Sequence, residues 1–456
     1  MAVGSHLTTP RWYSSSEAET QLLRSILLRA RNSSQARAVR AIVDGDSQET
    51  FSGGQGESWG MTVNYELWKR YGNSPESQAS VISVTGGAPA AYWGCRVHYG
   101  SSGIAGLATV DRYPYNMNPS VNNRYNNIDA GALLTLQADM AQINAALTHI
   151  PRDREYISRT GLKLRVLLPN LLGNQHSQMH YRCVYAATPS ANYYGTTTGQ
   201  ADVAVPASAS AFNNGFTEMA INYDFGGTPP TPANLFTMYP QVVLNSQAAT
   251  RIEVGSMWFS SGNTAGITLS SMSAGGKTTS AHFFDRPNLM EWMVPFAPDI
   301  IFLATEANDE AGVHITASQH ASDLADKILS YKNEFPDSVV IVLNDPDRSA
   351  AFSQSEWDSY PEAAVAAVDI AATGMCINRR RIMQELCDWR YGSSTFTQYV
   401  SDGVHYTVLG GKLLAEQDVS ALFNLAGLGG MPCGAPSRPA MQQMIKRQNQ
   451  QLRGHR

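Results

Sequence analysis

Residues that could perform nucleophilic chemistry lie near opposite ends of this 456-residue chain. Ser47 ends the stretch AIVDGDS, in which apolar residues run into a Gly-Asp-Ser corner, and Asp402 and His405 lie in the late stretch SDGVHYTVLGG. Serine is a poor nucleophile until a neighbouring base takes its proton, and histidine, whose pKa lies near neutral pH, suits that role. An aspartate three residues before a histidine can reach its ring and fix the tautomer. A turn at Ser47, built from residues that favour turns, is the alternative interpretation.

The surrounding elements predict where these residues meet. Towards both ends of the chain, near-continuous apolar strands alternate with helices, which is typical of a parallel sheet covered on both faces. Reactive groups gather at the carboxyl ends of the strands in such an open sheet. Polar or glycine-rich segments stand at four such positions, residues 44–47, 273–278, 305–309 and 401–411.

The segments DGDS, SAGGKT, TEAND and SDGVH together resemble the sequence blocks of the SGNH/GDSL hydrolase family. The resemblance covers residues 36–110 and 262–428. It implies an α/β fold with a flavodoxin-like, three-layer arrangement around a parallel sheet. It also implies a serine esterase that works through an acyl-enzyme and needs no metal or organic cofactor.

The same resemblance assigns roles to individual residues. Ser47 is expected to be the nucleophile, His405 the base and Asp402 the acid that orients the histidine. The oxyanion hole is expected to consist of the backbone N–H groups of Ser47 and Gly276 and the side-chain amide of Asn308. Donors of this kind are worth roughly 3–4 kcal/mol each in comparable sites.

Two positions depart from the family pattern. The third block usually opens with glycine, whereas Glu306 stands there in this chain, and a carboxylate opposes an oxyanion unless it points away. The second block has two candidate glycines, Gly276 and Gly87, since both follow apolar stretches. Gly276 lies about as far before Asn308 as the family pattern expects, so we expect Gly276 to contribute and keep Gly87 as the alternative.

The pattern of elements predicts an α/β domain that is interrupted by a β-rich insert. Helices are expected over residues 17–32, 61–72, 321–335 and 410–426, strands of the α/β part over 36–47, 79–87, 266–276, 298–309, 338–347 and 364–373, and a helix or long apolar stretch over 132–150. Short strands between Gly, Pro, Ser and Asn clusters predict a β-sandwich-like insert. The expected division is an N-terminal helical extension (1–35), the first part of the hydrolase domain (36–111), the insert (112–262), the second part (263–430) and a disordered basic tail (431–456).

Other candidate sites have weaker context. Ser58, in GESWG, fits the G-x-S-x-G nucleophile elbow, but polar and glycine-rich residues precede it instead of an apolar strand. We therefore interpret Ser58 as a loop residue near a helix start. His176 and His180 have the i, i+4 spacing of metal ligands without the glutamate of a zincin, and we interpret them as surface or packing residues. No cysteine pair has metal-ligand spacing, although Cys376 and Cys387 could form a disulfide.

Composition and charge exclude several classes of partner. The formal net charge of −5 gives no electrostatic case for nucleic acid or for an anionic membrane, and the basic C-terminal segment is short. No stretch approaches the ~18 apolar residues of a membrane span, and the first residues lack the pattern of a signal peptide. These absences predict a cytoplasmic or virion-associated protein by default.

The predicted substrate is a small ester or an acetylated glycan. The insert resembles, in layout only, the β-sandwich modules of SGNH enzymes that remove acetyl groups from polysaccharide or peptidoglycan. The alternative is a glycan-binding or structural protein, such as a phage tail component, that carries an SGNH-like domain.

Overall fold

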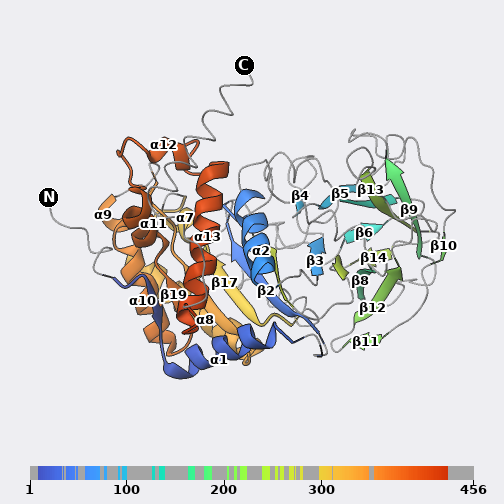
Figure 1. Cartoon of the computed structure of the whole chain (residues 1–456), viewed down its shortest axis with the longest axis horizontal. Coiled ribbons are helices and arrows are strands. Elements are labelled where there is room, and N and C mark those ends of the chain that lie inside the picture. The colour runs from blue at the N-terminus through green and yellow to red at the C-terminus, as the bar shows by residue number, and fades with distance from the viewer. Residues whose placement is uncertain are drawn as a thin grey trace, which may run out of the picture.

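The computed structural model describes two parts of the chain (Figure 1). The α/β part comprises residues 9–32, 34, 37–46, 48–49, 57–71, 266–271, 273, 278–280, 297–310, 312–348 and 354–429. The second part consists of strands between residues 76 and 260.

Six strands form the sheet of the α/β part, in the order β1-β19-β18-β17-β2-β16. The five strands from β19 to β16 pair in parallel, and β1 adds to β19 in antiparallel orientation. The parallel strands follow the order 2-1-3-4-5 of flavodoxin-like folds. Their bounds are Trp12–Ser14 for β1, Val39–Gly45 for β2, Ile267–Ser271 for β16, Ile300–Ala304 for β17, Val339–Leu343 for β18 and Met375–Ile377 for β19. Every residue of β2, β17 and β18 is buried, which confirms the expectation from their apolar sequences, and every residue of β19 is buried as well.

The helices begin where polar side chains can cap them. Ser16, Thr316, Asn378 and Thr407 each accept a hydrogen bond from a backbone N–H in the first turn of the following helix. The helices are α1 (Glu17–Arg29), α2 (Glu57–Tyr71), α7 (Glu306–Glu310), α8 (Ala317–Glu334), α9 (Gln354–Trp357), α10 (Tyr360–Ala371), α11 (Arg379–Cys387), α12 (Phe396–Tyr399) and α13 (Val408–Leu425).

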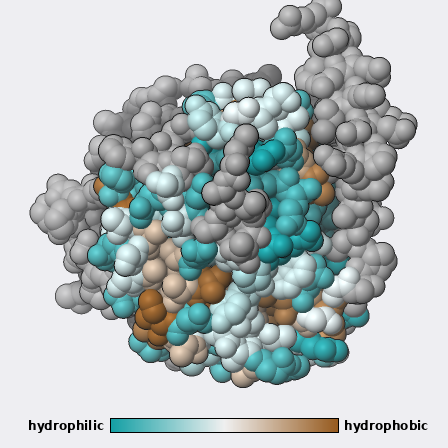
Figure 2. Space-filling model, turned by 90° about the vertical axis from the view of Figure 1, so that its left-hand side faces the viewer, coloured by the Kyte–Doolittle hydropathy of each residue, from teal (hydrophilic) through white to brown (hydrophobic). Residues whose placement is uncertain are grey.

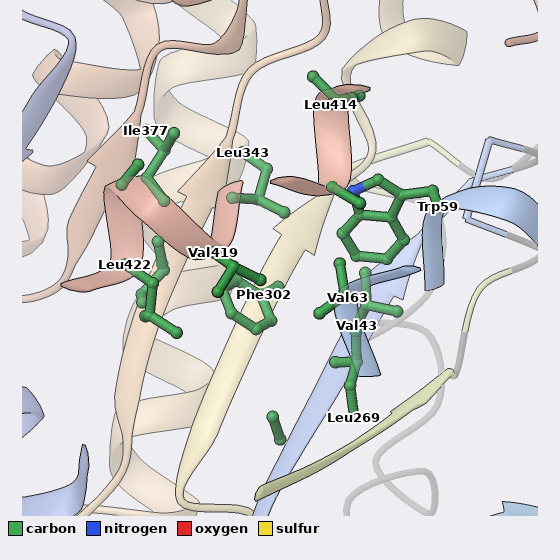
Figure 3. Packing of buried hydrophobic residues seen from close by; sticks show 14 of the residues in the cluster. Val43, Trp59, Val63, Leu269, Phe302, Leu343, Ile377, Leu414, Val419 and Leu422 are labelled. Carbon is green, nitrogen blue, oxygen red and sulfur yellow. The ribbon is translucent and has the colours of Figure 1, made fainter. Parts of the chain in front are cut away.

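Helices cover both faces of the parallel sheet. On one face, Val43 of β2 packs in a cluster with Trp59 of α2 and Val419 of α13 (Figure 3). Successive residues of a strand point to opposite faces, so Asp44 points to the other side. There its carboxylate accepts a hydrogen bond from Tyr331 of α8. The structure is therefore the three-layer arrangement that the sequence predicts.

One expected strand is a helix. Residues 364–373 fall largely within α10, and the strand of this region, β19, follows it. Alanine has the highest helix propensity, and Pro361 stands in the first turn, where proline is tolerated. The helix expected over 61–72 also begins earlier, at Glu57, which places Ser58 in the first turn of α2.

The strands between residues 76 and 260 form antiparallel sheets. Their orders are β10-β9-β13-β7-β5-β4, β11-β12-β8-β15-β3 and β14-β6. The first of these strands, β3, precedes residue 112, where we expected the insert to begin. The stretch 132–150, for which a helix was one alternative, contains the strand β7. The bounds are Glu76–Ala79 (β3), Ala91–Tyr92 (β4), Cys95–Tyr99 (β5), Asn126–Ile128 (β6), Leu133–Ala138 (β7), Lys163–Pro169 (β8), Met179–Ala186 (β9), Val203–Ala204 (β10), Ser210–Phe212 (β11), Phe216–Asn222 (β12), Tyr239–Ser246 (β13), Ile252–Val254 (β14) and Met257–Ser260 (β15).

Along the chain, the parallel strand that follows β2 is β16. The stretch 79–87, which we expected to supply a strand there, lies outside the described residues beyond Ala79, and Ala79 itself belongs to an antiparallel sheet. Gly87 and the tail 431–456 also lie outside the described residues.

The surface on the side of the α/β part shown in Figure 2 is mostly hydrophilic, with hydrophobic residues in small areas. Large apolar side chains that are exposed in the described residues are spread over several helices and turns: Leu28, Val313, Leu329, Ile370 and Tyr391. Scattered exposure of this kind is normal for a protein surface. None of the helices in the described residues has the length and apolar character to cross a bilayer.

Candidate active site

The GDS segment lies at the topological switch point of the sheet. β2 is a central strand, and the next two parallel strands along the chain, β16 and β17, pair on its two opposite sides. Ligands of open α/β sheets bind beyond the carboxyl ends of the strands at such a switch point. Ser47 follows this end of β2 and lies outside the described residues, whereas both its neighbours, Asp46 and Gln48, are described and buried.

Close packing explains the glycine of the GDS segment. A Cβ atom added to Gly45 would lie 2.8 Å from the Glu49 carboxylate and 2.8 Å from the Ser273 hydroxyl. After Gly45, the Asp46 side chain accepts a hydrogen bond from the Gln48 N–H at 2.9 Å, which makes the turn that was our alternative interpretation of this segment. A turn and a nucleophile are therefore compatible at this position.

The second half of the expected triad is an aspartate–histidine pair. Nδ1 of His405 lies 2.7 Å from Oδ2 of Asp402, and the other carboxylate oxygen accepts hydrogen bonds from the backbone N–H groups of Val404 and His405 at 3.0 and 2.7 Å. Partial burial raises the pKa of Asp402, but the hydrogen bonds from His405 and Val404 outweigh this and lower it to about 2. Asp402 is therefore an anion at neutral pH and holds the ring of His405 through Nδ1.

Backbone contacts fix the loop that carries His405. The N–H of Ser401 donates to the carbonyl of His405 at 2.9 Å, and Val400 and Tyr406 form an isolated β-bridge. Thr407 then caps α13. The side chain of Gln48 also binds this loop, because its Nε2 donates to the carbonyl of Val404 at 2.7 Å and its Oε1 accepts from the N–H of Tyr406 at 3.3 Å.

Asn308, the expected oxyanion donor, lies on α7 directly after the carboxyl end of β17 and is partly exposed. Its neighbour Asp309 is fully buried, and one carboxylate oxygen accepts from the N–H of Thr279 at 2.8 Å while the other lies 2.6 Å from Nδ1 of His320. Gly276 lies outside the described residues, but Thr279, three residues later, is thus tied to the residue that follows Asn308.

The Glu306 carboxylate is buried and paired with neighbouring groups. Its Oε2 accepts hydrogen bonds from the Asn344 side chain and the Asp345 N–H, both at 2.9 Å, and its Oε1 lies 3.3 Å from Arg380. Burial raises the pKa of Glu306, and Arg380 opposes that shift. The carboxylate that replaces the family's glycine is therefore part of the buried interior.

Buried charged side chains surround Glu49, which lies two residues after the GDS segment. Arg379 contacts Glu49 at 3.1 Å and Asp418 at 2.8 Å, and Trp59 donates to the same Asp418 carboxylate at 2.7 Å. The side chains of Arg379 and Glu49 have no exposed surface. Burial raises the pKa of Glu49 well above its usual range, with Arg379 opposing the shift.

Asp46 belongs to the same region. Burial, followed by the nearby carboxylate of Asp345, raises the pKa of Asp46 to about 7, while Arg348 opposes the shift. A fraction of Asp46 is therefore protonated at neutral pH, and the turn before Gln48 carries less negative charge than its sequence indicates.

Sequence analysis did not single out Gln48, Glu49, Arg379 or Asp418 as parts of the site. Gln48 and Glu49 directly follow the GDS segment and could have been considered for that reason. Arg379 and Asp418 carry no local signal, because their partners lie far away in the sequence.

The competing sites are not assembled by the described residues. Ser58 lies within a helix, and His180 lies on strand β9, where the helical i, i+4 spacing with His176 does not apply; His176 itself is outside the described residues. No cluster of metal-ligating side chains occurs in the described part of the chain. Cys376 and Cys387 do not form a disulfide.

No family model and no curated protein matches this chain. Among solved structures it is similar to one described as a peptidoglycan O-acetylesterase, with a TM-score of 0.56 and 13% identity, over 92% of this chain and 99% of the other. It is also similar to a lipase/acylhydrolase from Enterococcus faecalis (TM-score 0.28, 17% identity, 36% of this chain and 77% of the other). A family two carbohydrate esterase from Clostridium thermocellum has a TM-score of 0.26 and 9% identity, over 73% of this chain and 99% of the other.

The strand order of the sheet agrees with the likeness that extends over 92% of the chain. The first three sequence blocks follow β2, β16 and β17, and the fourth immediately precedes α13. This chain therefore has the SGNH hydrolase fold.

Proposed function

We propose that this protein is a serine ester hydrolase with Ser47 as nucleophile, His405 as base and Asp402 as the orienting acid. The observation that carries the proposal is the 2.7 Å contact between Asp402 and Nδ1 of His405, on a loop that is hydrogen-bonded to the residue after Ser47. Because Asp402 occupies Nδ1, Nε2 is the nitrogen that exchanges protons with Ser47.

The reaction follows from these roles. The hydroxyl oxygen of Ser47 attacks the ester carbonyl as its proton passes to Nε2 of His405, and the carbonyl oxygen becomes an oxyanion. The oxyanion accepts hydrogen bonds from the N–H groups of Ser47 and Gly276 and from the Asn308 amide. Collapse of the intermediate breaks the bond to the alcohol, which leaves with the proton from His405. Water then attacks the acyl-enzyme in the same way and releases the acid.

The proposed substrate is an acetyl ester on a glycan. The structural likeness to a peptidoglycan O-acetylesterase extends over 92% of this chain and supports that substrate as the first to test. Acetate release from O-acetylated peptidoglycan, compared with acetylated xylan, would show which glycan is preferred. The binding or structural alternative has less support, because the solved structure that is similar over 92% of this chain is described as an esterase.

The nucleophile can be tested with p-nitrophenyl acetate. The Ser47→Ala variant should lose turnover by roughly 10⁶-fold in kcat, as expected when the nucleophile of a triad is removed. Labelling with a fluorophosphonate followed by peptide mapping should modify Ser47. Wild-type turnover no faster than that of Ser47→Ala would contradict the proposal, and modification of Ser58 would assign the nucleophile to α2.

A further inference from the structure

Gln48 connects the two halves of the proposed triad. It directly follows Ser47 in the chain, and its side chain binds the backbone on both sides of His405, at the carbonyl of Val404 and the N–H of Tyr406. Gln48 is almost fully buried, with a relative exposure of 1%. The hydrogen bond from Tyr406 is buried and the one to Val404 is partly buried, so water competes little for either contact.

The chemistry of the site requires a carboxamide. The Val404 carbonyl needs a donor and the Tyr406 N–H needs an acceptor, and a carboxamide supplies one of each on a single side chain. The same two contacts determine which way round the amide lies, since the opposite orientation would face donor with donor and acceptor with acceptor. Glutamate would supply the acceptor without the donor, and methionine would supply neither.

Both ends of this connection are held independently. On the nucleophile side, the N–H of Gln48 donates to Asp46, and Glu49 is paired with Arg379. On the histidine side, the hydroxyl of Tyr406 donates to Asp345 at 3.0 Å. A link between two supported segments can set a distance, whereas a link to a mobile segment could not.

We propose that Gln48 is a positioning residue, which sets the separation between the Ser47 hydroxyl and the His405 ring by holding the histidine loop through its carboxamide. The inference rests on the proposed function of this site. Proton transfer depends steeply on this geometry, and a displacement of about 1 Å can cost roughly 10²-fold in rate.

The test is the Gln48→Met variant, which keeps the length of the side chain and removes both hydrogen bonds. With p-nitrophenyl acetate we expect kcat to fall roughly 10- to 100-fold while KM stays within about twofold, because the Gln48 side chain is buried and has almost no surface that a substrate could contact. Gln319→Met is the matched control, since the exposed Gln319 also loses an amide hydrogen bond, to Asp323 on α8. It should keep wild-type kcat.

A double-mutant cycle separates positioning from general damage. If Gln48 acts through the histidine, adding Gln48→Met to His405→Ala should cause little further loss of the remaining activity. Full additivity, or wild-type kcat in Gln48→Met, would overturn the inference. If Gln48→Met does not fold, Gln48→Asn keeps both polar groups on a shorter side chain and should show the same kcat loss. Failure of the proposed function itself appears separately, as unchanged turnover in Ser47→Ala and His405→Ala.

Discussion

At the scale of single residues, the proposed chemistry depends on which groups carry charge. Asp402 has a pKa of about 2, so it remains ionised at every pH above about 3. Asp46, with a pKa of about 7, gains a proton as the pH falls through neutrality. Only one of these carboxylates therefore changes state in the range where an esterase is usually measured.

The rate of ester hydrolysis should fall as the pH drops from about 8 to about 4, because a histidine base that has gained a proton cannot accept the serine proton. The measurement is kcat/KM for p-nitrophenyl acetate across this range. Asp402 does not contribute to the loss, since its lowered pKa keeps it an anion throughout. A rate that stays flat down to about pH 4 would indicate a different base.

Two variants show which residue causes the fall in the rate of ester hydrolysis at low pH. Asp402→Asn should lower kcat by up to roughly 10⁴-fold, through loss of the correct tautomer, and should still lose rate at low pH. Asp46→Asn keeps the oxygen that accepts from Gln48 and removes the carboxylate whose pKa is about 7. If the rate of Asp46→Asn no longer falls at low pH, the fall in the unchanged protein is caused by protonation of Asp46 and not of His405.

At the scale of elements, Asp309 joins three segments at the carboxyl edge of the sheet. It lies on α7, accepts from the backbone of Thr279 and pairs with His320 of α8. His320 in turn stacks on Tyr360 of α10, with ring centroids 4.6 Å apart. One buried carboxylate thereby aligns the element that carries Asn308 with the segment that follows Gly276.

Asp309→Ala should lower the free energy of unfolding by about 3–5 kcal/mol, because two buried partners lose the same carboxylate. Urea unfolding followed by circular dichroism would measure the change. Asp323→Ala, which removes an exposed hydrogen bond to Gln319 on α8, is the control and should alter the free energy by less than about 1 kcal/mol. Equal effects of the two variants would contradict this role of Asp309.

At the scale of the whole α/β part, residues distant in sequence meet around Arg379. Glu49, which follows β2, and Asp418 of α13 both pair with this arginine. The ring of Trp59 of α2 lies against the guanidinium group, and its N–H donates to Asp418. The apolar cluster on this face of the sheet includes residues of α2 and α13 (Figure 3). Charge pairing and apolar packing therefore join the same elements.

Arg379→Met should destabilise the protein by about 3–5 kcal/mol, since it leaves the buried carboxylates of Glu49 and Asp418 without their cation. The midpoint of urea unfolding is the measurement. Arg390→Met is the matched control, because Arg390 pairs with Asp388 at the surface, and it should change the free energy by no more than about 1 kcal/mol. A small effect of Arg379→Met would show that neighbouring groups compensate for the missing charge.

Local sequence patterns predicted much of the α/β part. Four parallel strands and the helices α1, α8 and α13 follow directly from apolar runs and helical periodicity, since both patterns are set by neighbours in the chain. The alanine-rich stretch that became α10 was misassigned, because a short apolar run fits a strand or a helix and propensity decides between them. The roles of Ser47, Asp402, His405, Asn308 and Gly276 stay predictions.

By itself, the sequence determined four of the parallel strands, the long helices α1, α8 and α13, the positions of the polar segments after the strands and the aspartate–histidine spacing, because each depends on residues close together in the chain. Only the tertiary structure decided that Glu306 contacts Arg380, that Gln48 binds the histidine loop and that Arg379 pairs with Glu49. Those contacts join residues up to several hundred positions apart, and their energies depend on burial, which no local pattern encodes.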